Sequence, residues 1–344
     1  MREPGGAGRT FVRGVKDYVK AHDRGIVPDQ HVLVFDEAQR AWDAARVAAK
    51  QNLEVPRSEP QLFIEFASRV PDWCVVVGLI GSGQEIYTGE EGGLQLWREA
   101  IDSAPRAAEW QVHGPASICQ HFADAPTPFS VESTLSLDTE LRQHSATHFH
   151  RYVAGLLAHA PAESLRLVAA DLERQSFTLR LSRNISVARS YLRERYSGDP
   201  RSLYGIVASA RNKKLDVDVA YNRKLGSWYS SDGSRSCRHL DECVTEFEAQ
   251  GLELDGALVI WGTDYRLVDG RWDASLQKRY RAYNVPRDPL MLRMNAYRVL
   301  LTRARDGIVL VVPEDPLLDA TFDYLKSSGF ADLEENEKPV TAAD

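Results

Sequence analysis

The sequence has few cysteines, no long hydrophobic run and no excess of positive charge. Its 344 residues include four cysteines, which are too few for a disulfide framework in a chain of this length. No stretch approaches the roughly 18 apolar residues of a membrane-spanning helix, and residues 1–10 lack the apolar core of a secretion signal. We therefore expect a soluble cytoplasmic protein with no membrane partner.

The net charge of −7 argues against a protein that coats nucleic acid with its whole surface. The charge is segregated, however, because residues 174–224 hold twelve Lys and Arg against four Asp and Glu. Residues 314–344 have the opposite bias, with nine acids and two lysines. The arginine-rich segment favours local phosphate contacts, although a solvated helix face balanced by acids elsewhere has the same composition.

A phosphate-binding loop of the Gly-x-x-x-x-Gly-Lys-Ser/Thr type is also missing. The glycine-rich residues 5–10 have a superficial likeness to such a loop, but Arg9 stands at the lysine position and Glu3 at that of the first glycine. No apolar strand precedes them, so we do not interpret this segment as a phosphate site.

Short apolar runs alternate with helical patterns along most of the chain. Strands are expected at residues 32–35, 74–78, 135–142, 177–181, 204–208, 257–261 and 308–312, with helices between them. Strands that alternate with helices predict an α/β fold with doubly wound parallel sheets. The length suits two domains, and residues 104–128, rich in Pro, Ala and His, are the expected crossing between them.

Two adjacent carboxylates, Asp36 and Glu37, directly follow the apolar run 32–35. The carboxyl ends of parallel strands are where ligands bind in open α/β sheets. There, the first acid could hold hydrated Mg²⁺ and the second could orient or deprotonate an attacking water. Two solvated acids between a strand and a helix fit these residues equally well.

The last third of the chain carries two further segments before expected strands. Residues 245–255 precede the strand at 257–261, and residues 295–305 indicate a helix that ends near Gly307. Between them, Asp269 and Gly270 predict the turn of a hairpin. Earlier, Trp228 and Tyr229 lie in a Gly/Ser-rich segment, where they could stack on bases or anchor a loop.

Together these segments resemble a superfamily 1 helicase, and within it the Schlafen-type group of DNA/RNA helicases. Residues 36–40 are similar to motif II, residues 81–84 after the strand at 75–78 to motif III, residues 141–142 to motif IV, residues 248–253 to motif V, and residues 301–305 to motif VI. The last two are the most specific, because both precede strands in the order of the family. The resemblance covers roughly residues 11–313.

This resemblance implies two RecA-like domains, the first of them N-terminally incomplete. Residues 1–128 would form the first domain, residues 129–313 the second, and residues 314–344 an acidic helix and tail. ATP and Mg²⁺ would bind between the domains, and single-stranded DNA or RNA would lie across their tops. By this resemblance Asp36 would hold Mg²⁺, Glu37 would activate water, and Gln84 would sense the γ-phosphate.

The second domain would complete the nucleotide site. The resemblance implies nucleotide contacts from Gln250, Gly251 and Glu253, with Glu253 close to the ribose. Arg142 and Arg303 would act as arginine fingers that spread charge from the transferring phosphoryl group. Arginine suits that role because its guanidinium is a rigid fork that always carries charge.

The missing phosphate loop is the main departure from the family pattern. Only 35 residues precede Asp36, too few for the loop, its helix and another strand. We therefore expect an N-terminal or partner polypeptide to supply the loop, the whole being an ATP-driven nucleic-acid translocase or helicase. Two alternatives remain open, namely a nucleic-acid-binding or regulatory module that kept the fold and lost turnover, and a soluble α/β domain with accidental matches.

Overall fold

The protein is described from a computed structural model, which divides the chain into two compact units, Met1–Asp138 and Thr139–Asp344. The structure describes residues 12–22, 25–51, 56–81, 85–88, 90, 92–136, 148–221, 224–280 and 285–336. The predicted Gln84 and Arg142 lie outside these ranges. The predicted boundary after residue 128 falls just before a strand of the first unit, residues 129–131.

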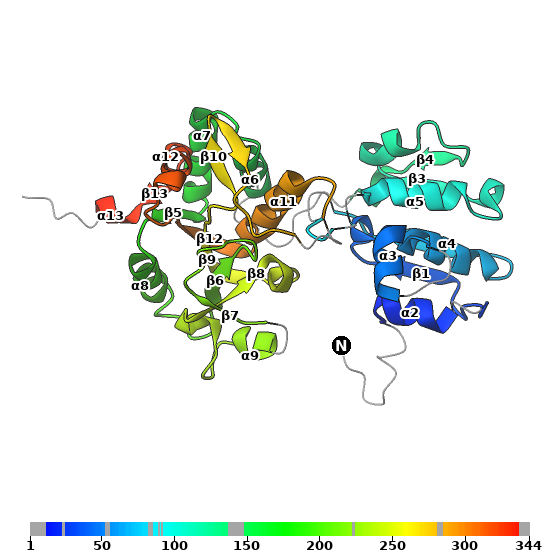
Figure 1. Ribbon diagram of the computed structural model, residues 1–344, viewed down its shortest axis with the longest axis horizontal. Coiled ribbons are helices and arrows are strands. Elements are labelled where there is room, and N and C mark those ends of the chain that lie inside the picture. Colours follow the sequence, from blue (N-terminus) through cyan, green and yellow to red (C-terminus); the bar gives the residue numbers. More distant parts are fainter. Residues whose placement is uncertain are drawn as a thin grey trace, which may run out of the picture. The chain divides into compact units, whose positions relative to one another are not determined.

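The first unit combines short parallel strand pairs with helices (Figure 1). Its elements are α2 (Val15–His22), β1 (Val32–Phe35), η1 (Ala38–Arg40), α3 (Ala44–Gln51), α4 (Glu59–Arg69), β2 (Val75–Gly78), α5 (Gly93–Asp102), η2 (Ala107–Glu109), β3 (Val112–Gly114), η3 (Ala116–Phe122), β4 (Phe129–Val131) and η4 (Ser133–Leu135). β1 pairs with β2 and β3 with β4, both in parallel. In the segment 135–142, where a strand was expected, Leu135 ends η4, and residues 137–142 lie outside the described ranges.

One face of the β1–β2 pair forms the core of this unit. Leu33 and Phe35 point inward against α4 and α5, and the Phe35 ring meets Trp97 edge-on at 5.2 Å. The opposite face exposes four valines, Val32, Val34, Val75 and Val77. Such exposure is unusual, because parallel sheets normally have both faces covered.

The second unit is built on a seven-stranded sheet. Its elements are α6 (Phe149–Leu157), α7 (Ala162–Arg174), β5 (Thr178–Ser182), α8 (Ile185–Arg195), β6 (Tyr204–Ala208), β7 (Asp218–Val219), α9 (Leu225–Trp228), η6 (Cys237–His239), β8 (Glu242–Thr245), α10 (Glu246–Ala249), β9 (Leu254–Ile260), β10 (Arg266–Val268), β11 (Arg271–Asp273), α11 (Pro289–Leu301), β12 (Ala304–Val311), η7 (Pro316–Leu318), α12 (Asp319–Ser327), β13 (Ala331–Asp332) and α13 (Leu333–Asn336).

Every pairing in this sheet is parallel, in the order β13-β5-β12-β9-β6-β8-β7. Side chains alternate between its two faces, so that Ile308 and Leu310 join one core and Val309 and Val311 the other. Helices α6, α7, α11 and α12 cover the first face, and α8 covers the second (Figure 1). The predicted α/β class is confirmed, and this unit has helices on both faces of a parallel sheet.

Several boundaries differ from the sequence predictions. The helical region expected between the strands at 32–35 and 74–78 is divided, since η1 ends at Arg40 and α3 begins only at Ala44. The helix expected through Arg305 ends at Leu301, and β12 begins already at Ala304. The hairpin prediction is confirmed, since β10 and β11 pair antiparallel, and Asp269 and Gly270 both have positive φ.

Among the described residues, no helix is both long and apolar enough to cross a membrane.

Replacing Leu310 with Ala tests the core of the seven-stranded sheet. Leu310 is fully buried, and its strand neighbours are Leu181 and Val259. We expect Leu310→Ala to lower the free energy of unfolding by about 2–5 kcal/mol, because the truncation leaves a cavity that the sheet cannot close. Leu167→Ala is the matched control, since Leu167 is 71% exposed. Urea unfolding measures both, and equal midpoints for the two variants would contradict this packing.

Candidate functional site

The acid pair lies just beyond the carboxyl end of β1. Asp36 is exposed and Glu37 is partly buried. Glu37 has a left-handed backbone, with φ of 55° and ψ of 44°, and its amide donates to Asp36 Oδ1 at 3.0 Å. This conformation costs a non-glycine residue about 1 kcal/mol or more, and such strain is concentrated at functional sites. The tight turn places both acids directly after the last residue of β1.

Gln39 connects the acid pair to the end of β2. Its Nε2 donates to Glu37 Oε2 at 2.7 Å, and its Oε1 accepts from the Gly81 amide at 2.9 Å. Gln39 is buried, with 3% of its surface exposed. The bridge fixes the Glu37 carboxylate relative to the loop that follows β2. The sequence placed Gln39 inside the motif II match without assigning it a role, so only the structure shows this bridge.

An ion pair between Arg40 and Glu90 holds the part of the same loop that contains Ile86 and Tyr87. The Arg40 guanidinium lies 3.3 Å from the Glu90 carboxylate, which also accepts from the amides of Ile86 and Tyr87 at 2.9 and 3.1 Å. Burial raises the pKa of Glu90, although Arg40 and both amides oppose that shift. The residues after the predicted Gln84 are therefore tethered to the chain that follows the acid pair.

The segment predicted to match motif V leaves the sheet through α10. Thr245 caps that helix, because its side chain and amide are bonded to Glu248 in a capping box. Gln250, partly buried, then ends the helix with extended backbone angles, and Gly251 adopts φ of +80°. A side chain at residue 251 would be strained in that conformation. The glycine therefore turns the chain back toward the start of β9.

Glu253 and Arg305 form an ion pair at the amino edge of the sheet. Their positions follow from the strands, since Glu253 immediately precedes β9 and Arg305 is the second residue of β12. The Glu253 carbonyl also accepts from the Tyr229 hydroxyl at 2.7 Å. Trp228 is completely buried, and its Nε1 donates to the Glu242 carbonyl. Of the two interpretations of Trp228 and Tyr229, the structure supports the loop anchor.

Arg303 is buried, with 6% of its surface exposed. Its Nε donates to the Val299 carbonyl at 2.9 Å, and its Nη1 lies 3.4 Å from the carbonyls of Ala249 and Leu252. These bonds tie the end of α11 to the Gly251 turn. The predicted arginine-finger role stays a prediction, and it requires the guanidinium to exchange these carbonyls for phosphate oxygens.

A buried ionic network occupies the opposite, carboxyl edge of the same sheet. Arg293 Nη2 donates to Glu246 Oε1 at 2.8 Å, and its Nη1 lies 3.3 Å from Asp264 Oδ2. Ser209 Oγ bonds both Arg293 and Asp264, and the Tyr297 hydroxyl donates to Asp264 Oδ1 at 3.0 Å. All five side chains are at most 1% exposed.

This network joins the ends of three strands to one helix. Ser209, Glu246 and Asp264 follow β6, β8 and β9, whereas Arg293 and Tyr297 lie on α11. Burial acts to lower the pKa of Arg293, but Glu246 and Asp264 raise it above its ordinary value. The sequence did not reveal this network, although each of its three strand-end residues is polar and follows an apolar run.

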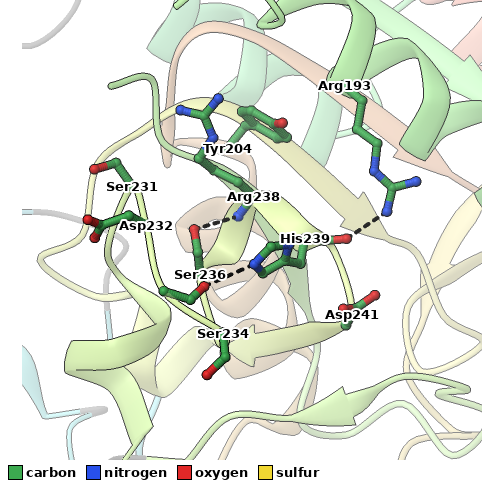
Figure 2. A pocket seen from close by; sticks show the side chains of 10 residues that line it. Arg193, Tyr204, Ser231, Asp232, Ser234, Ser236, Arg238, His239 and Asp241 are labelled. Atoms are coloured by element: carbon green, nitrogen blue, oxygen red, sulfur yellow. Dashed lines mark hydrogen bonds between the residues drawn. The ribbon is translucent and has the colours of Figure 1, made fainter. Parts of the chain in front are cut away.

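A separate pocket of about 570 Å³ opens at the amino end of β6 (Figure 2). Arg193, Tyr204, Arg238 and His239 line it, together with Asp232 and other residues of the 231–241 loop. Its cations already support the fold, since Arg238 donates to the carbonyls of Asp199 and Ser202, and Arg193 to that of His239. Because acids also line the pocket, its charge favours neither an anionic nor a cationic ligand.

No group of three His, Cys, Asp or Glu residues within the described ranges could hold a metal ion. Mg²⁺ in nucleotide sites needs only one or two protein carboxylates, since phosphates and water complete its octahedron. The exposed Asp36 carboxylate fits that requirement, and its role as a Mg²⁺ ligand stays a prediction.

Replacing Arg293 tests the network at the carboxyl edge. Arg293→Met leaves the carboxylates of Glu246 and Asp264 buried without their cation, so we expect the free energy of unfolding to fall by about 3–5 kcal/mol. Arg305→Met is the control, because its ion pair is partly exposed and is worth at most about 1 kcal/mol. Urea unfolding monitored by circular dichroism measures both. A small and equal loss in the two variants would show that the network contributes little.

The buried Glu59 carboxyl should make the stability of the first unit depend on pH. Burial raises the pKa of Glu59 to about 7, although the Trp42 amide opposes the shift. The folded state thus binds this proton more tightly than the unfolded state does. Stability is highest below the unfolded pKa and falls as the pH rises through the folded value, by on the order of 3 kcal/mol.

Glu59→Gln should remove this dependence between about pH 4.5 and pH 7, whereas Glu99→Gln, at an exposed position on α5, should retain it. The test compares the urea unfolding midpoints of the wild type and the two variants across that pH range, measured by tryptophan fluorescence. Identical pH profiles for the wild type and Glu59→Gln would refute the assignment.

Comparison with known proteins supports the Schlafen-type part of the resemblance inferred from the sequence. A search of curated proteins finds no match. The family model described as Schlafen group 3, DNA/RNA helicase domain matches residues 9–314. That span contains the acid pair, the Gly251 turn, Arg303 and the Arg293 network. Because the match covers most of the 344 residues, the chain belongs to the Schlafen group 3 DNA/RNA helicase domain family.

Proposed function

We propose that this chain is part of an ATP-dependent nucleic-acid translocase or helicase of superfamily 1, with two RecA-like domains of which the first is incomplete in this sequence. Its partners would be single-stranded DNA or RNA. The observation that carries the proposal is the Gln39 bridge, which holds the Glu37 carboxylate at the end of β1 against the loop after β2. Membership of a helicase-domain family supports it.

In the first unit, Asp36 would bind Mg²⁺ and Glu37 would orient and deprotonate the attacking water. Bound Mg²⁺ would supply the positive charge that the β- and γ-phosphates require. Gln39 accepts a hydrogen bond from the Gly81 amide and donates one to the Glu37 carboxylate. It would therefore keep Glu37, the proposed general base, in one rotamer. Gln84 would report the γ-phosphate to this same loop.

In the second unit, Gln250, Gly251 and Glu253 would contact the nucleotide, and Arg142 and Arg303 would neutralise the transferring phosphoryl group. Arg303 now bonds the Ala249 and Leu252 carbonyls on either side of the Gly251 turn. Its movement to a phosphate would release that turn. Such an exchange would couple the nucleotide state to the segment that begins at Thr245.

The phosphates need a cradle that this sequence does not contain, because it has no Gly-x-x-x-x-Gly-Lys-Ser/Thr loop. We propose that an N-terminal or partner polypeptide supplies the loop as part of a further strand and helix. The exposed valines on the β1–β2 pair support this proposal, since such a segment would cover the open face of a parallel sheet.

A second candidate function is a nucleic-acid-binding or regulatory module that does not hydrolyse ATP. The observation in its favour is that Arg303 bonds the protein's own carbonyls. In such a module the acid pair would be a structural remnant and the single strand would still bind.

ATP turnover by the assembly that this chain forms in its own cells distinguishes the two functions. We expect tagged wild-type chain, purified with its bound polypeptides, to hydrolyse ATP faster when single-stranded DNA or RNA is present. Glu37→Gln should lower that rate by about 100-fold or more, because it removes the general base. The control Glu132→Gln alters an exposed acid and should leave the rate unchanged.

Strand binding without turnover would favour the second function. Absence of both binding and turnover would contradict the two functions together.

A further inference from the structure

Two loops meet at the carboxyl edge of the seven-stranded sheet. One follows β6 and begins at Ser209, and the other follows the β10–β11 hairpin. The Lys278 amide donates to the Arg211 carbonyl at 3.0 Å, and Arg211 Nη1 donates back to the Arg279 carbonyl at 3.2 Å. The Arg211 guanidinium lies 3.9 Å from the centre of the Tyr280 ring. These contacts define the Arg211–Tyr280 patch, which comprises Arg211, Lys213, Lys278, Arg279 and Tyr280.

The buried Arg293 network fixes the first of these loops. Ser209 Oγ, a member of the network, accepts from the Arg211 amide at 3.1 Å. The Ala210 amide donates to Glu246 Oε2 at 2.7 Å. The patch therefore rests on a rigid support, and little conformational entropy is lost when a ligand binds to it.

The charge of the patch is positive. Lys213, Lys278 and Arg279 are exposed, and among the described residues no carboxylate forms an ion pair with them, whereas the neighbouring Lys214 pairs with Asp315. The exposed Asp216 is the nearest acid along the loop after β6. The two acids beneath, Glu246 and Asp264, are buried and matched by Arg293.

This combination suits a single-stranded nucleic acid. Cations spaced along two loops can follow a phosphate backbone, and an aromatic ring stacked on a guanidinium provides a flat surface for a base. Ligands of open parallel sheets also bind beyond the carboxyl ends of the strands. We propose that the Arg211–Tyr280 patch binds the backbone and one base of single-stranded DNA or RNA, an inference that rests on the proposed function.

Charge removal tests the backbone contact. The triple variant Lys213→Gln, Lys278→Gln and Arg279→Gln is titrated with fluorescent oligo(dT) and oligo(U) of about 20 nucleotides at several salt concentrations. Each phosphate contact contributes about 0.7 to the slope of log affinity against log salt for single strands. We therefore expect the slope to decrease by about 2 and the Kd at low salt to rise by about 10- to 100-fold.

The matched control removes three cations elsewhere on the same unit. Arg166, Arg174 and Arg201 are exposed on α7 and after α8, so the variant Arg166→Gln, Arg174→Gln and Arg201→Gln changes the net charge equally. It should retain the wild-type slope. If both triple variants bind alike, net charge alone is responsible and the patch is rejected.

Tyr280 tests the base contact independently of charge. Tyr280→Ala should weaken binding by about 5-fold or more while the salt slope stays unchanged, because stacking does not depend on counterion release. Tyr280→Phe should bind like the wild type. Equal affinities for Tyr280→Ala and Tyr280→Phe would overturn the stacking role.

Further outcomes distinguish a failure of the proposed patch from a failure of the proposed function. If the triple variant loses its fold by circular dichroism, the single variant Lys213→Glu, at an exposed position, must still weaken binding for the patch to stand. Wild-type chain that binds neither oligonucleotide would reject the proposed function and the patch together. Wild-type binding with an unaffected patch variant would reject the patch alone.

Discussion

The buried Arg293 guanidinium is the interaction on which the second unit depends. It is bonded to Glu246 and Asp264, each fully buried, and Ser209, Tyr297 and the Ala210 amide donate further hydrogen bonds to these two carboxylates. Removing one member would leave charge in a medium that solvates it poorly. The network therefore keeps α11 and the ends of three strands in one arrangement.

That constraint separates the two edges of the seven-stranded sheet. The carboxyl edge is rigid and carries the Arg211 loop, whereas the amino edge carries the Gly251 turn and Arg303, held by main-chain carbonyls. Carbonyl bonds to a guanidinium can be exchanged for phosphate bonds without leaving a buried charge unpaired. Under the proposed function, Arg303 would exchange its carbonyls for phosphate oxygens at the amino edge, while the buried network would hold the carboxyl edge in place.

Local patterns predicted much of the fold. The strands at 32–35 and 204–208 were found with the predicted limits, because both are short runs of apolar, mostly β-forming residues. The hairpin turn at Asp269 and Gly270 was also correct. The end of α11 was missed, since Arg303, Ala304 and Arg305 have good helix propensity. Contacts distant in sequence end the helix instead, because Arg303 Nη1 bonds the Ala249 and Leu252 carbonyls and Ala304 pairs with Leu254 in the sheet.

The sequence by itself determined the α/β class, the acid pair at the end of β1 and the family, because these depend on residue order and short-range periodicity. Tertiary structure alone decided which polar side chains meet. Gln39 reaches Gly81 across 42 positions, and Arg293 reaches Ser209 across 84. The physical reason is that parallel strands bring their carboxyl ends together only after the intervening helices have packed, so no local pattern records those partners.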